Sequence, residues 1–75
     1  MKEFNLVEAI SGAEVCTKAG HKVRIICWDS KIKDYPIVAL ETMDDGEETI
    51  GEYTLNGQFT IWEKEDPIFD LMMVD

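Results

Sequence analysis

The sequence has little of several residue types, and each shortage excludes a class of protein. Its only cysteines, Cys16 and Cys27, lie far apart, whereas zinc sites need closely spaced pairs. No run of about 18 apolar residues is present, so no segment could span a membrane as a helix. Seven basic residues stand against sixteen acidic ones, which gives a net charge of −9 at pH 7. Such a surface cannot as a whole neutralise the phosphates by which nucleic acid is held.

Residues that carry chemistry are also scarce. The single histidine, His21, follows a turn glycine, and the sequence identifies no partner for it. There is no phosphate-binding glycine loop and no nucleophile motif, and so short a chain has little room for a pocket of converging groups. We therefore expect a protein that is not an enzyme and that uses no cofactor and no metal, with His21 as a surface turn residue.

The chain has the length of one small domain over residues 1–75. Hydrophobic residues make up 45% of it and charged residues 31%, which is typical of a folded domain rather than a disordered tail. A domain of this size buries roughly 60% of the surface that its unfolded chain exposes, so we expect a small core. The N-terminus lacks the apolar core of a signal peptide, which predicts a cytoplasmic protein.

A short helix is expected near the N-terminus, over residues 6–11. Asn5 is a good N-cap residue, and Glu8, three residues later, completes a capping box. Gly12 can end the helix in a left-handed conformation. Two turns are not stable alone in water, so the helix must pack against the rest of the fold. The side chains that we expect in this contact are Leu6, Ala9 and Ile10.

A β-hairpin follows, with strands expected at 14–18 and 21–29. Gly20 favours a three-residue loop that closes in a glycine bulge, and this register pairs Thr17 with His21 and Val15 with Val23. The two cysteines then lie on opposite faces of the sheet and cannot form a disulfide.

Four more strands are expected, at 37–43, 48–54, 58–63 and 68–74. The first of these is apolar on both faces, which predicts a central position in the sheet. Asp44-Asp45-Gly46 is a turn signal, and Leu55-Asn56-Gly57 repeats the logic of the first hairpin turn. The resulting register pairs Tyr53 with Phe59, and Gly51 with Ile61.

Short strands joined by tight turns predict a mainly β fold. We expect a small, partly open antiparallel barrel of five to six strands, with one short N-terminal helix that plugs one end or covers an edge. The last strand, 68–74, is apolar on both faces, so it lies either at the centre of the sheet or against another chain. Because an open barrel also leaves an edge strand, we predict weak homodimerisation through residues 68–74.

The charges are unevenly distributed along the chain. Residues 1–37 carry six bases and five acids, whereas residues 38–75 carry one base and eleven acids. The acids between positions 41 and 52 form a cluster that lacks the alternating oxygen ligands of a calcium-binding EF-hand loop. It is either a solvated strand face or a surface that attracts a basic groove on another protein. Its members are Glu41, Asp44, Asp45, Glu47, Glu48 and Glu52.

A second group of residues favours a different function. Arg24 and Trp28 share a face of the first hairpin, and Tyr35 lies in the loop that follows. Aromatic side chains among basic ones can stack on nucleotides or single strands, and small barrels often bind oligonucleotides. The net charge argues against nucleic acid as the partner.

Several segments of the chain carry a resemblance: Phe4-Asn5-Leu6, Glu8-Ala9, Gly12, Val15, Thr17, Gly20, Lys22-Val23-Arg24-Ile25-Ile26-Cys27 and Tyr35-Pro36-Ile37-Val38-Ala39-Leu40. Together they resemble a group of small proteins of gut Bacteroides-type bacteria and their phages. The similarity covers about half of the chain, mostly residues 4–40, and Ala19 departs from the acidic residue expected before the turn glycine. The resemblance implies a prophage or mobile-element setting, where short acidic proteins often bind and block a host protein, sometimes as mimics of DNA charge. It supplies no catalytic or ligand residues.

Two hypotheses follow. The first is a non-enzymatic, acidic protein-interaction module, a prophage-encoded modulator of a host protein, whose contact residues are Asp44, Asp45, Glu47 and Glu48. The alternative is a barrel that binds a small ligand, a nucleotide or a single strand through Arg24, Trp28, Tyr35 and Trp62.

Overall fold

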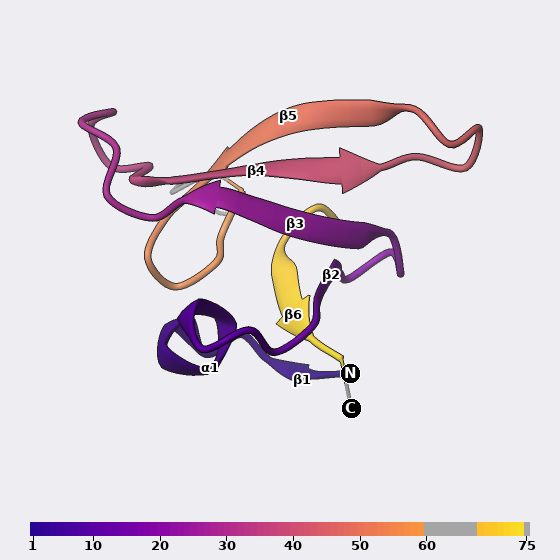
Figure 1. Cartoon of the computed structure of the whole chain (residues 1–75), viewed down its shortest axis with the longest axis horizontal. Helices are drawn as coiled ribbons and strands as arrows, with labels where there is room; N and C mark the ends of the chain where they lie inside the picture. The colour runs from indigo at the N-terminus through magenta and orange to yellow at the C-terminus, as the bar shows by residue number, and fades with distance from the viewer. Residues whose placement is uncertain (60–67, 75) are drawn as a thin grey trace.

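The fold is a single antiparallel sheet with one short helix (Figure 1). The computed structural model describes residues 1–59 and 68–74. Within them the strand order is β1-β6-β2-β3-β4-β5. The predicted class, mainly β with five to six short antiparallel strands in a partly open arrangement and an N-terminal helix, is confirmed. The elements are β1 (Lys2–Glu3), α1 (Leu6–Ile10), β2 (Val15–Thr17), β3 (Lys22–Cys27), β4 (Ile37–Thr42), β5 (Glu48–Tyr53) and β6 (Leu71–Met73).

The sheet is curled and partly open. In Figure 1, β3, β4 and β5 form a long ribbon, and β6 crosses behind it at a steep angle. The turn after β5 returns to the start of β6, where Leu71 N–H donates to the Gly57 carbonyl oxygen (N···O 2.7 Å) and Phe59 N–H donates to Asp70 Oδ1 (2.9 Å). The two ends of the sheet therefore approach each other. The outermost strands of the described chain, β1 and β5, are not hydrogen-bonded to each other as neighbouring strands, so the sheet stays open.

The helix α1 begins and ends as its sequence predicts. Asn5 Oδ1 accepts a hydrogen bond from Glu8 N–H (3.0 Å), which is the expected N-cap. At the other end Gly12 has φ 103°, and its N–H donates to the Ala9 carbonyl oxygen. The helix covers the core only partly, because none of its residues is fully buried and Ile10 is exposed. Leu6 and Ala9 of the helix pack against the core, and so does Phe4, which precedes the N-cap residue Asn5.

The two Thr-x-x-Gly turns adopt the same structure. Thr17 N–H donates to the His21 carbonyl oxygen (2.8 Å), and Thr17 Oγ1 accepts from His21 N–H (3.1 Å). Thr54 makes the same two bonds with Gln58, at 2.9 Å and 3.1 Å. The glycines of the two turns have φ of 96° and 83°. Both predicted three-residue loops are therefore confirmed.

The predicted pairing of the first hairpin is confirmed as well, since Val15 lies opposite Val23. Cys16 is buried, Cys27 is half-buried, and the two form no disulfide with each other. The sequence did not indicate the β-bulge between Ile25 and Cys27, where the register against β4 shifts by one residue.

The strand β4 lies between β3 and β5, as its apolar composition predicts. Beside it, the rings of Tyr53 and Phe59 meet edge-on with centroids 5.9 Å apart, in agreement with the predicted pair. The expected partner of Gly51, Ile61, lies outside the described residues. Of the strand expected at 58–63, residues 58 and 59 are not in a strand, and the others also lie outside the described part.

The last strand differs from the expectation. It spans only Leu71–Met73, because residues 68–70 form a turn that accepts hydrogen bonds from the first hairpin turn. Lys18 N–H donates to the Asp70 carbonyl oxygen (2.9 Å). The strand is central rather than exposed, since it pairs with β2 on one side and with β1, which the sequence did not indicate, on the other.

The core lies inside the curl of the sheet. The buried hydrophobic cluster consists of Val15, Val23, Ile37, Ala39, Tyr53, Leu71 and Met73.

No helix among the described residues has the length and apolar character needed to cross a bilayer.

Candidate functional site

The side of β3, β4 and β5 that points away from the core carries an exposed apolar centre. We call this side the outer face. Arg24, Leu40 and Ile50 lie in one row across the three strands, because Leu40 pairs with both of the others. Val38 pairs with Glu52 in the next outer row. Ile50 is 68% exposed and Ile26 is 53% exposed, whereas Val38 and Leu40 are half-buried. The outer face comprises Lys22, Arg24, Ile26, Val38, Leu40, Thr42, Glu48, Ile50 and Glu52.

Arg24 and Glu48 form a two-pronged ion pair across this face. Arg24 Nε donates to Glu48 Oε2 (2.9 Å), and the guanidinium also donates through Nη2 to Oε1 (3.1 Å). These hydrogen bonds lower the pKa of the Glu48 carboxyl and raise the pKa of Arg24. The sequence assigned these two residues to different hypotheses, but the structure joins them. Each therefore partly neutralises the charge that the other could offer to a partner.

The other predicted acidic contact residues lie in the turn between β4 and β5. Asp44, Asp45 and Glu47 are all exposed there, and the hairpin projects beyond the rest of the sheet (Figure 1). Asp45 Oδ1 also accepts a hydrogen bond from Glu47 N–H (2.9 Å), so this carboxylate helps to hold the turn. The structure thus presents these carboxylates together at one tip.

His21 joins the two hairpins, which the sequence did not predict. Its Nδ1 lies 2.6 Å from Glu41 Oε2, and its Nε2 lies 3.1 Å from Asp44 Oδ1. Glu41 is only 6% exposed, on the core side of β4. The hydrogen bond that the Glu41 carboxylate accepts raises the pKa of His21 despite some desolvation, and the negative charge of Asp44 adds to the effect. The expectation of a surface turn residue is wrong, because His21 is half-buried between these carboxylates.

Knowledge of the register between β3 and β4 would have predicted this cluster. Val23 pairs with Glu41, so His21, two residues earlier on the same face, is a diagonal neighbour of that carboxylate. The sequence predicts both strands but not their register, because the polar loop between them has no turn signal that defines it.

The His21 cluster does not have the form of a metal site. Its two ring nitrogens contact different carboxylates, so the three side chains do not converge on one point. In residues 1–59 and 68–74 no group of three or more histidine, cysteine, aspartate or glutamate side chains is arranged to hold a metal ion.

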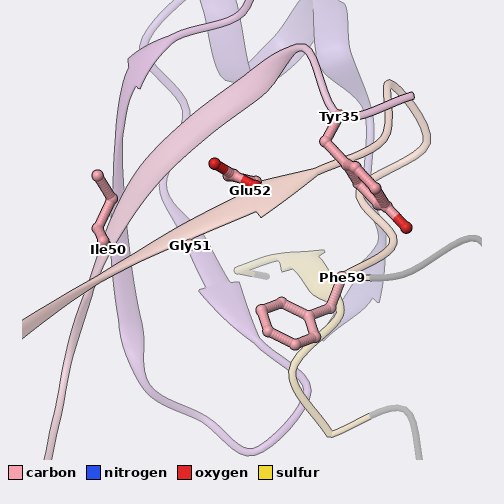
Figure 2. A pocket seen from close by; sticks show the side chains of 5 residues that line it. All are labelled: Tyr35, Ile50, Gly51, Glu52 and Phe59. Carbon is pink, nitrogen blue, oxygen red and sulfur yellow. The ribbon is translucent and has the colours of Figure 1, made fainter. Parts of the chain in front are cut away.

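The residues of the alternative hypothesis are separated. Arg24 and Trp28 line a cleft of about 490 Å³ between α1 and β3, together with Ile10, Lys22 and Ile25. Tyr35 lines a different recess of about 210 Å³ beside β5 (Figure 2). Trp62 lies outside the described residues. The structure thus brings together the basic and aromatic side chains of the first hairpin only. The recess around Tyr35 is formed with Ile50, Gly51, Glu52 and Phe59.

Comparison with protein families identifies the chain's relatives. Residues 1–72 match the family described as Haemophilus phage HP1 protein YO09. The chain belongs to this family. No curated protein and no solved structure matches it.

Membership of the YO09 family makes the chain a phage-related small protein. This agrees with the phage setting implied by the residues between positions 4 and 40. The match spans nearly the whole chain, including the acidic hairpin and the first two residues of β6. A link to Bacteroides-type hosts stays a prediction.

Proposed function

We propose that this YO09-family protein is a non-enzymatic interaction module, a phage-encoded modulator that binds a host protein through its acidic β4–β5 hairpin. One observation carries the proposal. The exposed carboxylates of the projecting turn adjoin the outer face, where Ile50 is exposed on β5 of the same hairpin. A partner with a basic surface beside an apolar patch would complement both features.

The two features have different physical roles. Like-signed carboxylates at a projecting tip attract a basic partner over a distance of about 10 Å at 0.1 M salt and raise the rate of association. An exposed isoleucine supplies apolar area that leaves water on contact, which is typical of the centre of an interface. The phage family supports a host protein as the partner, and a Bacteroides-type host is the one that the resemblance implies.

Affinity capture from a host lysate tests the proposal. The bait Asp44→Asn/Asp45→Asn/Glu47→Gln/Glu48→Gln should lose the partner that the wild-type bait retains, because the three carboxylates of the turn and the adjoining one of Glu48 are gone. The substitutions keep the shapes of the side chains, and circular dichroism checks that the bait is folded.

A matched control separates the tip from net charge. The variant Glu3→Gln/Glu14→Gln/Asp29→Asn/Asp34→Asn also removes four acids, all of them exposed and distant in sequence from the tip. It should capture the partner like the wild type. An unchanged catch by the tip variant, or equal losses by both variants, would show that the tip is not the binding site.

A second function is favoured by the cleft beside α1. Lys22, Arg24 and Trp28 line it together, which is a basic and aromatic arrangement suited to a nucleotide or a short single strand. A phosphate there would have to compete with Glu48 for Arg24. Tryptophan fluorescence at low salt, with nucleotides and short oligonucleotides, should show quenching that Trp28→Phe abolishes. Absence of quenching by all of them excludes this function, because electrostatic binding is strongest at low salt.

A further inference from the structure

The outer face has opposite charges on its two borders. Its β3 border carries Lys22 and Arg24, and its β5 border carries Glu48 and Glu52. Val38 and Leu40 of β4 lie between the borders, and the apolar area continues onto the borders themselves with Ile26 of β3 and Ile50 of β5. The face therefore has an apolar centre and two borders of opposite charge.

We propose that this face binds the same face of a second copy of the chain. A two-fold axis parallel to β4 would place β3 of each copy over β5 of the other, so that each basic border meets an acidic one. Such an isologous contact is the commonest arrangement in homo-oligomers. One step along the ladder from Val23 and Glu41, Lys22 shares a row with Thr42 and Glu48. The axis therefore brings Lys22 of one copy toward Glu48 of the other.

The charge order is what favours a second copy over another partner. A uniformly basic surface would be repelled by Lys22 and Arg24, and a uniformly acidic one by Glu48 and Glu52. The ion pair between Arg24 and Glu48 weakens both effects, so Lys22 and Glu52 contribute most to them. Only a surface with both signs in the reverse order fits, and the two-fold axis supplies it from the same sequence. The inference goes beyond the proposed function because it names a second copy of the chain. The two share Ile50 and Glu48, but only the proposed function depends on Asp44, Asp45 and Glu47 of the turn.

The exposed isoleucines provide the apolar contact. Ile50 at 68% and Ile26 at 53% exposure would lose solvent contact, and burial of apolar area is favourable by about 25 cal/mol per Å². The face is small, however: three strands about 4.8 Å apart and about 20 Å long cover much less than the roughly 800 Å² per partner of a standard interface. The charge of −9 on each copy adds repulsion. The dimer is therefore weak and forms at high protein concentration.

This surface differs from the one predicted from sequence. Both backbone edges of β6 are hydrogen-bonded within the chain, to β1 and to β2, so pairing through residues 68–74 would have to use the half-buried Met72 side chain. Homodimerisation through that strand stays a prediction, and the same experiment compares the two surfaces.

Sedimentation velocity tests the proposal, from about 1 μM to about 1 mM protein, the range of micromolar to millimolar dissociation constants. The wild type should shift toward the dimer, and Ile50→Asp should weaken association at least tenfold. The matched control is Val7→Asp, which adds the same charge at an equally accessible apolar residue of α1, 73% exposed. It should dimerise like the wild type.

A charge pair of variants tests the borders. Lys22→Glu should weaken the dimer, whereas Lys31→Glu, an identical charge change in the exposed loop after β3, should weaken it less. Circular dichroism checks each fold, and Ile26→Asp replaces Ile50→Asp if that variant is unfolded.

Three results would overturn the proposal: a wild type that is monomeric throughout, an Ile50→Asp variant that dimerises normally, or dissociation by Met72→Asp alone. A monomeric wild type would leave the capture experiment with the turn carboxylates unaffected, so the two proposals fail independently.

Discussion

At the scale of single residues, Gly51 and Tyr53 depend on each other. The Tyr53 side chain is 1% exposed and folds back over Gly51, two residues earlier on the inner face of β5. Burial raises the pKa of its phenol to about 12, and the negative charges of Glu41 and Asp70 contribute. The ring occupies the space that a side chain at position 51 would need.

Replacing Gly51 by alanine should therefore destabilise the fold. A Cβ at this position would lie 2.7 Å from Tyr53 Oη and 3.1 Å from the ring, so the buried ring would have to shift. Overpacking of this kind costs roughly 1–3 kcal/mol, which urea denaturation measures. Glu52→Ala, at the exposed neighbour on the same strand, is the control and should change the free energy of unfolding much less. Equal effects of the two substitutions would contradict the packing argument.

His21 should make stability depend on pH. Its pKa is raised in the folded state, chiefly by the hydrogen bond to Glu41 and then by Asp44, from an unfolded value of 6.5. The stabilisation is therefore fully present below pH 6.5 and is lost as the pH rises through the folded pKa. Urea midpoints of the wild type should fall over this window relative to those of His21→Asn. Parallel pH profiles for the two proteins would show that the cluster does not stabilise the fold through its charge.

At the scale of elements, the two Thr-x-x-Gly turns decide where the hairpins reverse. In each, the threonine hydroxyl accepts the backbone N–H of the residue that follows the glycine. Thr17 is completely buried and Thr54 nearly so, and a backbone donor left without an acceptor in such surroundings is unfavourable.

Thr17→Val and Thr54→Val should each destabilise the protein by about 1–3 kcal/mol, because valine keeps the shape but not the acceptor. Chemical denaturation measures the loss. Thr49→Val, at an exposed position of β5, is the control and should be nearly neutral. If Thr17→Val were as mild as the control, the hydroxyl would not be needed to close the first turn.

At the scale of the whole molecule, the charges act together. The net charge of −9 opposes the compact state, and few bases offset it locally. Salt weakens this repulsion, because the distance over which charges interact falls from about 30 Å at 0.01 M ionic strength to about 10 Å at 0.1 M.

Raising NaCl from about 0.01 M to about 0.1 M should therefore raise the urea midpoint of the wild type. The tip variant with four neutralised acids should show a smaller rise, since less repulsion remains to be screened. A midpoint that falls with salt would mean that ion pairs such as Arg24 with Glu48 outweigh the net repulsion.

Local features of the fold were predictable where neighbours in sequence decide them. Asn5 and Glu8 cap the helix through a contact three residues apart, and Gly20 alone in its turn adopts positive φ without strain. The prediction that the last strand includes residues 68–70 is wrong for a tertiary reason. These residues accept hydrogen bonds from the first hairpin turn instead of extending β6.

The candidate site was predictable only in part. The turn carboxylates lie together because they are consecutive in sequence, but the pairing of Arg24 with Glu48 requires the alignment of three strands. The sequence does not reveal that alignment, because it does not indicate the bulge after Ile25 and because the length of the loop after β3 does not define the register.

The sequence by itself determined the elements of this protein: the capped helix, the two alike turns, the central β4 and the separation of charge along the chain. These depend on backbone preferences and hydrophobic pattern over a few residues. The tertiary structure alone decided which strands became neighbours, and with them the insertion of β6 between β1 and β2 and the placement of His21 beside the buried Glu41. Such contacts join residues about twenty or more positions apart, and many registers satisfy the same local pattern until the core selects one.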